Sequence, residues 1–429
     1  MAQFTAQVYQ NEFLPDGGTD VHAIVTVTCT DAGSVGGGAA GDAAELIIID
    51  TSGSMGPQFG EDKISAAKRG AAAALDQVND GVWFAVIAGN HLAQLAFPNT
   101  GRLALARMDA STRAASKQAV QSLRADGGTA MGTWLRLAVQ LFDTQPGLAR
   151  RHAILLTDGE NQHETPQQLT ENIEYARGRF EADCRGVGAD WQVAELRRIS
   201  DALMGTIDVI PSADQLAGAF ERLMRASMGR GVAAATLRVW APQGAQVLFV
   251  RQVAPTVEDM TSRRQEVNAL TGGYPTGSWG NESRDFHVAI RLPAKAIGQE
   301  QLAARVQLAI GEEVRAQGLV KAQWSGDDTL TARINPEVAH YTGQTELAAA
   351  IQDGLAAKAA GDEEAATAKL GRAVQLAAQT GNEEATTRLK KVVEIEDPEA
   401  GTVRLKRGVD KLDEMALDTA STKTTRVKK

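Results

Sequence analysis

The stretch of sequence that decides the fold is Leu46-Ile47-Ile48-Ile49-Asp50-Thr51-Ser52-Gly53-Ser54, a run of apolar residues followed at once by a polar loop. Four successive apolar residues are typical of a strand that is buried on both faces, as in a parallel sheet. In such sheets, ligands bind beyond the carboxyl ends of the strands. Because Gly53 permits a tight turn, we expect Asp50, Ser52 and Ser54 to point toward one site there.

Two later loops offer further oxygen atoms for the same site. Asp158 follows the apolar run 153–156, and Thr129 stands in a glycine-rich loop before a helical segment. Carboxylate and hydroxyl oxygens suit magnesium or manganese, whereas zinc and copper favour nitrogen and sulfur. An octahedral ion leaves at least one of its positions open for water or an incoming group. The sequence therefore predicts a Mg2+ (or Mn2+) site formed by Asp50, Ser52, Ser54, Thr129 and Asp158.

The residues around these loops alternate between strand and helix patterns. One helical stripe carries Ile64, Ala67, Ala71, Leu75 and Val78 on the same face, and the short apolar run 83–87 follows it. The alternation continues to residue 228. It predicts an α/β fold, with a doubly wound, mostly parallel, Rossmann-like sheet over residues 44–228.

The segments on either side show the period of two that is typical of half-buried antiparallel strands. It runs through residues 21–29 before the α/β region and through 286–292 after it. Two N-terminal strands are too few to be stable alone. We therefore expect residues 1–43 and 229–342 to form one discontinuous β-sandwich that carries the α/β domain as an insertion, with the glycine-rich stretch 31–44 as a linker.

The C-terminal part predicts a helical hairpin module over residues 343–417. The segment Gly361-Asp362-Glu363-Glu364-Ala365 recurs twenty residues later as Gly381-Asn382-Glu383-Glu384-Ala385, so that a glycine ends one helix and an Asp or Asn caps the next. This repeat resembles helical-hairpin arrays of the tetratricopeptide type. A peptide-binding surface and a bundle without a ligand remain open as its role.

Residues 418–429 are polar, rich in hydroxyl groups and basic, and we expect them to be a disordered tail. Thr422, Thr424 and Thr425 would then be accessible to a protein kinase. Phosphorylation would add about −1.5 to −2 of charge and create an anchor for a phosphothreonine reader.

Composition excludes several classes of function. The 429 residues carry a net charge of −9, which disfavours nucleic acid and anionic membranes as partners. No stretch approaches the roughly 20 apolar residues that cross a bilayer, and the first ten residues lack the pattern of a signal peptide. With only two distant cysteines, Cys29 and Cys184, the chain is expected to be cytoplasmic.

The loop residues closely resemble the von Willebrand factor type A (vWA) family. Its metal motif is Asp-x-Ser-x-Ser, then a Thr, then an Asp after a later strand, and all five positions match here. The resemblance implies a metal ion-dependent adhesion site (MIDAS) in which Ser52, Ser54 and Thr129 contact the ion directly. It implies that Asp50 and Asp158 act largely through bound water, and that an acidic side chain of a partner protein completes the coordination.

We therefore expect a bacterial metal-dependent protein-binding or scaffold module, used in intracellular signalling or a stress response, and not an enzyme. The alternative is a Mg-dependent phosphohydrolase, because an Asp after a buried strand also opens the active site of such enzymes. Those enzymes need a second Asp two residues later as acid and base, and this chain has Ser52 there.

Overall fold

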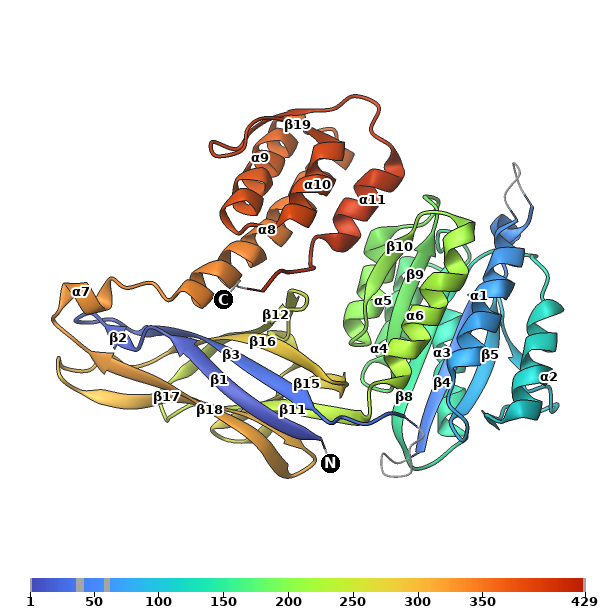
Figure 1. Cartoon of the computed structure of the whole chain (residues 1–429), viewed down its shortest axis with the longest axis horizontal. Helices are drawn as coiled ribbons and strands as arrows, with labels where there is room; N and C mark the ends of the chain where they lie inside the picture. The colour runs from blue at the N-terminus through green and yellow to red at the C-terminus, as the bar shows by residue number, and fades with distance from the viewer. Residues whose placement is uncertain (1, 36–41, 58–61, 427–429) are drawn as a thin grey trace. The chain divides into compact units, whose positions relative to one another are not determined.

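The computed structural model describes residues 2–35, 42–57 and 62–426. The chain divides into two compact units (Figure 1). Unit 1 is made of Met1–Asp31, Ala234–Thr276 and Asn281–Lys429, and unit 2 of Ala32–Ala233 and Gly277–Gly280. Most of the glycine-rich stretch predicted as a linker, residues 36–41, lies outside the described residues.

Unit 2 is the α/β part of the chain. Its sheet has the order β10-β9-β8-β4-β5-β6, with β7 also beside β5. The pairs from β10 to β5 are parallel, and only β6 and β7 run antiparallel to β5. Its elements are β4 (Asp42–Asp50), α1 (Lys63–Gln77), β5 (Trp83–Gly89), β6 (Ala93–Phe97), β7 (Ala106–Arg107), α2 (Ala110–Gln121), α3 (Met131–Asp143), β8 (Leu148–Thr157), α4 (Pro166–Ala176), β9 (Glu181–Val187), α5 (Val193–Ala202), β10 (Ile207–Ile210) and α6 (Leu216–Met228).

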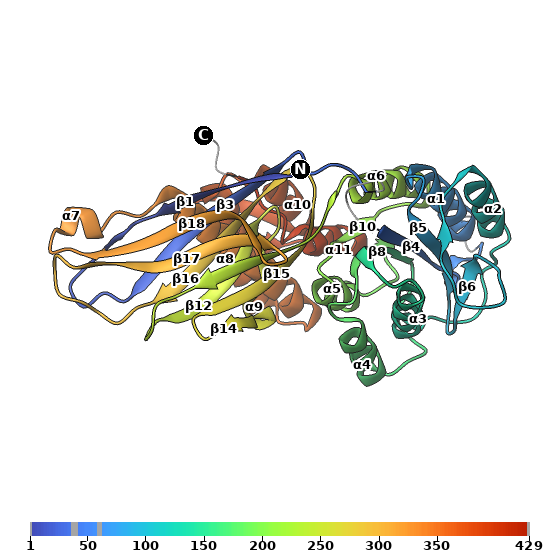
Figure 2. The same ribbon diagram turned by 90° about the horizontal axis from the view of Figure 1, so that it is seen from below.

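The predicted mostly parallel sheet is thus confirmed, and burial explains why the sequence forms it. Leu46 and Ile48 on β4 are completely buried, because helices cover both faces of the sheet. Figure 2 shows α1 and α6 on one face and α3, α4 and α5 on the other. The apolar stripe of α1 packs with α6 in the core of its face, where Leu75 and Phe220 have no exposed surface.

Unit 1 contains two larger sheets, which are mainly antiparallel. One has the order β1-β3-β16-β12-β13 and the other β14-β15-β11-β17-β18-β2, in which the short β2 is parallel to β18. The sheets face each other where Gly318 lies against Val8 and Val25. Their strands are β1 (Gln3–Gln10), β2 (Phe13–Leu14), β3 (Asp20–Thr30), β11 (Val232–Trp240), β12 (Gln246–Ala254), β13 (Glu258–Asp259), β14 (Gln265–Asn268), β15 (Thr271–Trp279), β16 (Glu282–Arg291), β17 (Glu300–Ile310) and β18 (Glu313–Trp324).

The last part of unit 1 is helical, as predicted, and its repeat has the expected caps. Gly361 and Gly381 have positive φ angles of 80° and 64°. The side chains of Asp362 and Asn382 then accept hydrogen bonds from the backbone at the start of the next helix. The elements are α7 (Asp328–Thr331), α8 (Pro336–Ala359), α9 (Glu363–Gln379), α10 (Glu383–Val392), a hairpin of β19 (Val393–Asp397) and β20 (Thr402–Leu405), and α11 (Lys411–Ala420).

The expectation of a disordered tail over 418–429 is wrong for residues 418–426. Helix α11 extends to Ala420, and the segment after it pairs with the sheet edge near β13. The N–H of Val257 donates to the Thr422 carbonyl over 2.7 Å, and the N–H of Thr424 donates to the Pro255 carbonyl over 3.0 Å. Residues 427–429 lie outside the described residues.

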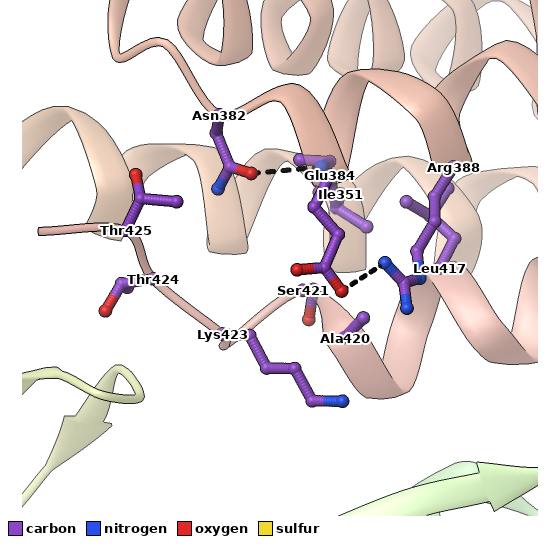
Figure 3. A pocket seen from close by; sticks show the side chains of 11 residues that line it. Ile351, Asn382, Glu384, Arg388, Leu417, Ala420, Ser421, Lys423, Thr424 and Thr425 are labelled. Carbon is purple, nitrogen blue, oxygen red and sulfur yellow. Dashed lines mark hydrogen bonds and ion pairs between the residues drawn. The ribbon is translucent and has the colours of Figure 1, made fainter.

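Figure 3 shows this segment closing one side of a pocket whose other wall comes from α10 and the end of α11. Main-chain hydrogen bonds hold the segment, so its polar composition gave no sign of them.

In the part of the chain that the structure describes, none of the helices combines the length and the apolar surface needed to cross a bilayer.

Candidate metal centre

The three predicted loops meet at the carboxyl end of the sheet in unit 2, and backbone hydrogen bonds join them. The N–H of Thr51 donates to the carbonyl of Gly89 at the end of β5 over 2.6 Å. The Thr51 carbonyl in turn accepts from the N–H of Asp126, and the N–H of Gly53 donates to the Gly127 carbonyl, both over 2.8 Å. The loop after β4 is therefore fixed to the loop before α3 independently of any ligand.

The predicted side chains come together where these loops meet. The hydroxyl oxygens of Ser52 and Ser54 lie 3.0 Å apart. Ser54 Oγ donates to Asp158 Oδ1 over 2.7 Å. The hydroxyls of Ser54 and Thr129 both lie close to Gly159, since a Cβ there would stand 3.2 Å from Ser54 Oγ and 3.4 Å from Thr129 Oγ1. A glycine at position 159 therefore avoids crowding these two hydroxyls.

Asp50 is held behind the hydroxyl groups. Its Oδ1 accepts from the N–H of Ser52 over 2.7 Å, and its Oδ2 accepts from the hydroxyl of Thr157 over 2.5 Å. The pKa of Asp50 is raised to about 6, because the effect of burial, with a smaller one from the charge of Asp158, outweighs the hydrogen bonds from Ser52 and Thr157, which lower it. Because Asp50 and Asp158 are both completely buried, a cation beside them would be strongly stabilised.

The donor set fits a hard divalent cation. Two neighbouring ligands of an octahedral ion at about 2.1 Å stand about 3.0 Å apart, which is the separation of the Ser52 and Ser54 hydroxyls. Among residues 2–35, 42–57 and 62–426, no group of three or more His, Cys, Asp or Glu side chains could hold a metal. This site differs from such clusters, because three of its five residues, Ser52, Ser54 and Thr129, offer hydroxyl groups.

The structure adds a cation that the sequence analysis missed. Lys63, the first residue of α1, places its Nζ 2.8 Å from Asp158 Oδ2 and 3.5 Å from Asp190 Oδ2. Burial acts to lower the pKa of Lys63, but the hydrogen bond and charge of Asp158, with a smaller effect from Asp190, raise it above its usual value. Lys63 is 95 residues from Asp158 in the chain, and a helix-starting lysine carries no signal of such a contact.

Two histidines, His91 and His163, also border the site. The ring of His163 fills the space beside Gly128, where a Cβ would lie 1.8 Å from the His163 Cε1. His91 does the same at Gly127, where a Cβ would lie 2.3 Å from the His91 Nδ1. The N–H of His163 donates to the Thr129 carbonyl over 2.9 Å. The two glycines thus allow the rings to pack against the loop that presents Thr129.

Comparisons with known proteins show which family the chain resembles. The family model described as the von Willebrand factor type A domain matches residues 45–209, and that of the von Willebrand factor type A C-terminal domain matches residues 375–421. A solved structure described as von Willebrand factor type A from Catenulispora acidiphila is 47% identical. The match covers 99% of this chain and 97% of the Catenulispora chain, with a TM-score of 0.92.

Two more distant proteins are also similar. The ArnB paralog VWA2 from Sulfolobus acidocaldarius is 16% identical over 98% of both chains, with a TM-score of 0.62, and so shares the fold. The uncharacterized protein sll0103 of Synechocystis sp. is 28% identical over 225 residues, which are 51% of this chain and 50% of that protein. The chain thus matches about half the length of this curated relative. By its full-length similarity to the Catenulispora protein, the chain belongs to the von Willebrand factor type A family.

Proposed function

We propose that this protein is a metal-dependent binding module whose MIDAS recognises an acidic side chain of a protein partner. The observation that carries the proposal is the convergence of Ser52, Ser54 and Asp158, with oxygen atoms 2.7–3.0 Å apart, at the carboxyl end of a parallel sheet. Domains of this family are typically non-enzymatic modules that mediate protein–protein interactions, and they often bind a divalent metal.

The chemistry of the ligands supports an acidic partner. In the proposal, Ser52, Ser54 and Thr129 coordinate Mg2+ (or Mn2+) directly through neutral hydroxyls, while Asp50 and Asp158 act through bound water. Neutral ligands leave most of the charge of the ion uncompensated, so that it attracts a carboxylate from outside. The hydrogen bonds that Asp50 accepts from Ser52 and Thr157 agree with a supporting role behind the hydroxyls.

The phosphohydrolase alternative has less support. Such an enzyme would need Asp50 as an accessible nucleophile and an acid two residues later. Asp50 is completely buried and both its carboxylate oxygens accept hydrogen bonds. Release of phosphate from a generic phosphoester that depends on both Mg2+ and Asp50 would favour the enzyme.

A second proposal concerns the segment after α11. We propose that Thr422, Thr424 and Thr425 are phosphorylated and then bound by a phosphothreonine reader, which would connect the module to bacterial signalling or a stress response. The hydroxyl of Thr424 donates to the Val253 carbonyl, and that of Thr425 accepts from Gln344, so the segment must detach before a kinase can act. Mass spectrometry of the native protein that finds these threonines unmodified in every growth condition would exclude the proposal.

We further propose that the module acts in the cytoplasm. The free thiols of Cys29 and Cys184, both of which are buried, agree with a reducing compartment.

The central proposal is tested by capture of partners on the immobilised full-length protein in Mg2+ and in EDTA. The wild type is compared with Asp50→Ala and with Asp126→Ala, an exposed acidic residue on the neighbouring loop. We expect partners that are retained only by the wild type and Asp126→Ala, only in Mg2+, and that are displaced by a peptide containing Glu. The same partners under all conditions would exclude recognition through the metal.

A further inference from the structure

Lys63 is built into the edge of the candidate metal centre. Its side chain is only 13% exposed, and its Nζ lies 2.8 Å from a carboxylate oxygen of Asp158, which is completely buried. Its second partner, Asp190, is farther away at 3.5 Å and is 76% exposed. The close contact is therefore the one with Asp158, and Asp190 adds a weaker, solvent-screened attraction.

Asp158 divides its two oxygen atoms between different partners. Oδ1 accepts from the hydroxyl of Ser54 over 2.7 Å and so faces the hydroxyl groups of the site. Oδ2 is bound by the ammonium group of Lys63. Lys63 thus neutralises Asp158 from outside the group of proposed metal ligands, and an ion held by the hydroxyls would share this carboxylate with Lys63.

We propose that Lys63 is a positioning residue that sets the metal affinity of the site: it stabilises the metal-free protein by compensating Asp158, and it thereby weakens the binding of the divalent ion. The inference rests on the proposed function, because it requires a metal at this site. The ion would bind and dissociate as its concentration changes. Because Asp158 is already compensated by Lys63, the bound ion would be less neutralised by the protein and would attract an external acidic ligand more strongly.

The two effects of Lys63 have opposite signs, which separates this role from a purely structural one. Without metal, removal of Lys63 leaves the buried Asp158 without a counter-charge and near Asp50, so the protein should lose stability. With metal bound, the same removal leaves the ion as the cation that compensates Asp158, so the ion should bind more tightly. A residue that merely held the loop in shape would, on removal, lower both the stability and the metal affinity.

The size of the effect can be bounded. A cation in contact with a carboxylate changes the pKa of that carboxyl group by about 1–3, which is a tenfold or larger change in its affinity for a proton. Because a divalent cation responds to the same charge, we expect Lys63→Met to bind Mg2+ on the order of tenfold more tightly than the wild type does.

The test measures Mg2+ affinity by calorimetric titration and the unfolding temperature in EDTA and in Mg2+. It uses the full-length wild type, Lys63→Met, and Lys63→Arg, which keeps the charge. Lys68→Met is the matched control, since Lys68 lies on the same helix but its Nζ donates to the Gln121 carbonyl. We expect Lys63→Met alone to show a lower unfolding temperature in EDTA together with a lower Kd for Mg2+.

An equal or higher Kd for Lys63→Met would overturn the inference while leaving the metal site intact. No binding of Mg2+ or Mn2+ by the wild type would instead refute the proposed function. If Lys63→Met fails to fold without metal, Lys63→Gln prepared in Mg2+ gives the same comparison. In that case a Kd at or above that of the wild type would contradict the proposed role.

Discussion

At the scale of single residues, Gly128 gives a sharp prediction. Gly128→Ala places a methyl group where the ring of His163 now lies, so the ring or the loop must move. We expect a loss of about 1–3 kcal/mol in the free energy of unfolding and weaker Mg2+ binding, because Thr129 is the next residue. Chemical denaturation and metal titration measure both effects.

The control for this prediction is Gly229→Ala, where the nearest atom to the new Cβ would be 3.5 Å away and in ordinary contact. His163→Ala combined with Gly128→Ala should recover much of the lost stability, since it vacates the space. A Gly128→Ala protein as stable as the wild type would show that the loop is not packed as described.

His152 predicts how stability depends on pH. It is completely buried; its Nδ1 lies 2.5 Å from Glu45 Oε1, and its Nε2 lies 3.1 Å from Asp183 Oδ2. Burial acts to lower the pKa of His152, but the two carboxylates raise it above 6.5. The stabilisation is therefore fully present below about pH 6.5 and is lost as pH rises through the folded-state pKa.

We expect the unfolding temperature of the wild type to fall between neutral and alkaline pH more steeply than that of His152→Gln. Thermal unfolding at several pH values measures the two slopes. Equal slopes would mean that His152 is not the titrating group.

At the scale of elements, the segment after α11 fastens α8 to the sheet of unit 1. Arg426 Nε lies 3.3 Å from Asp285 Oδ2, and the hydroxyl of Tyr341 on α8 donates to the same oxygen over 2.5 Å. Because the Asp285 side chain is only 3% exposed, it depends on this counter-charge. Arg426→Ala should lower the free energy of unfolding by about 1–3 kcal/mol.

A double-mutant cycle with Asp285→Asn checks this prediction by denaturant unfolding. If the contact is the cause, Arg426→Ala should cost much less in the Asp285→Asn background. Additive effects of the two substitutions would indicate that the ion pair does not stabilise the protein.

Several elements could be predicted from the sequence because their signals are local. The apolar run before Asp50 identified β4, and the Gly-Asp and Gly-Asn pairs at 361 and 381 identified the helix boundaries. The short strands β6, β19 and β20 were missed, since each has few residues and depends on its neighbour for stability.

The site was partly predictable for the same reason. The five oxygen-bearing residues stand directly after buried strands or in a glycine-rich loop, and the topology of a parallel sheet brings such positions together. Lys63 and His91 could not be found in this way, because their places depend on contacts between distant segments. The docked segment after α11 escaped notice because its contacts are largely made by backbone groups.

At the scale of the whole molecule, all five proposed ligands belong to unit 2. A metal that binds only the folded form stabilises it by RT ln(1 + [L]/Kd), about 2.7 kcal/mol at a hundredfold excess over Kd. Scanning calorimetry should therefore show that Mg2+ raises the unfolding transition of unit 2 and leaves that of unit 1 in place. A shift of both transitions, or of neither, would contradict a site confined to unit 2.

The most direct test of the central claim is a calorimetric titration of the metal-free protein with Mg2+ and with Mn2+. It compares the wild type with Asp158→Ala, Ser52→Ala and the exposed-acid control Asp126→Ala. The proposed site predicts one ion per chain for the wild type and for Asp126→Ala, and a large loss of affinity for the other two variants. Unchanged binding in Asp158→Ala and Ser52→Ala, or no binding by the wild type, would contradict it.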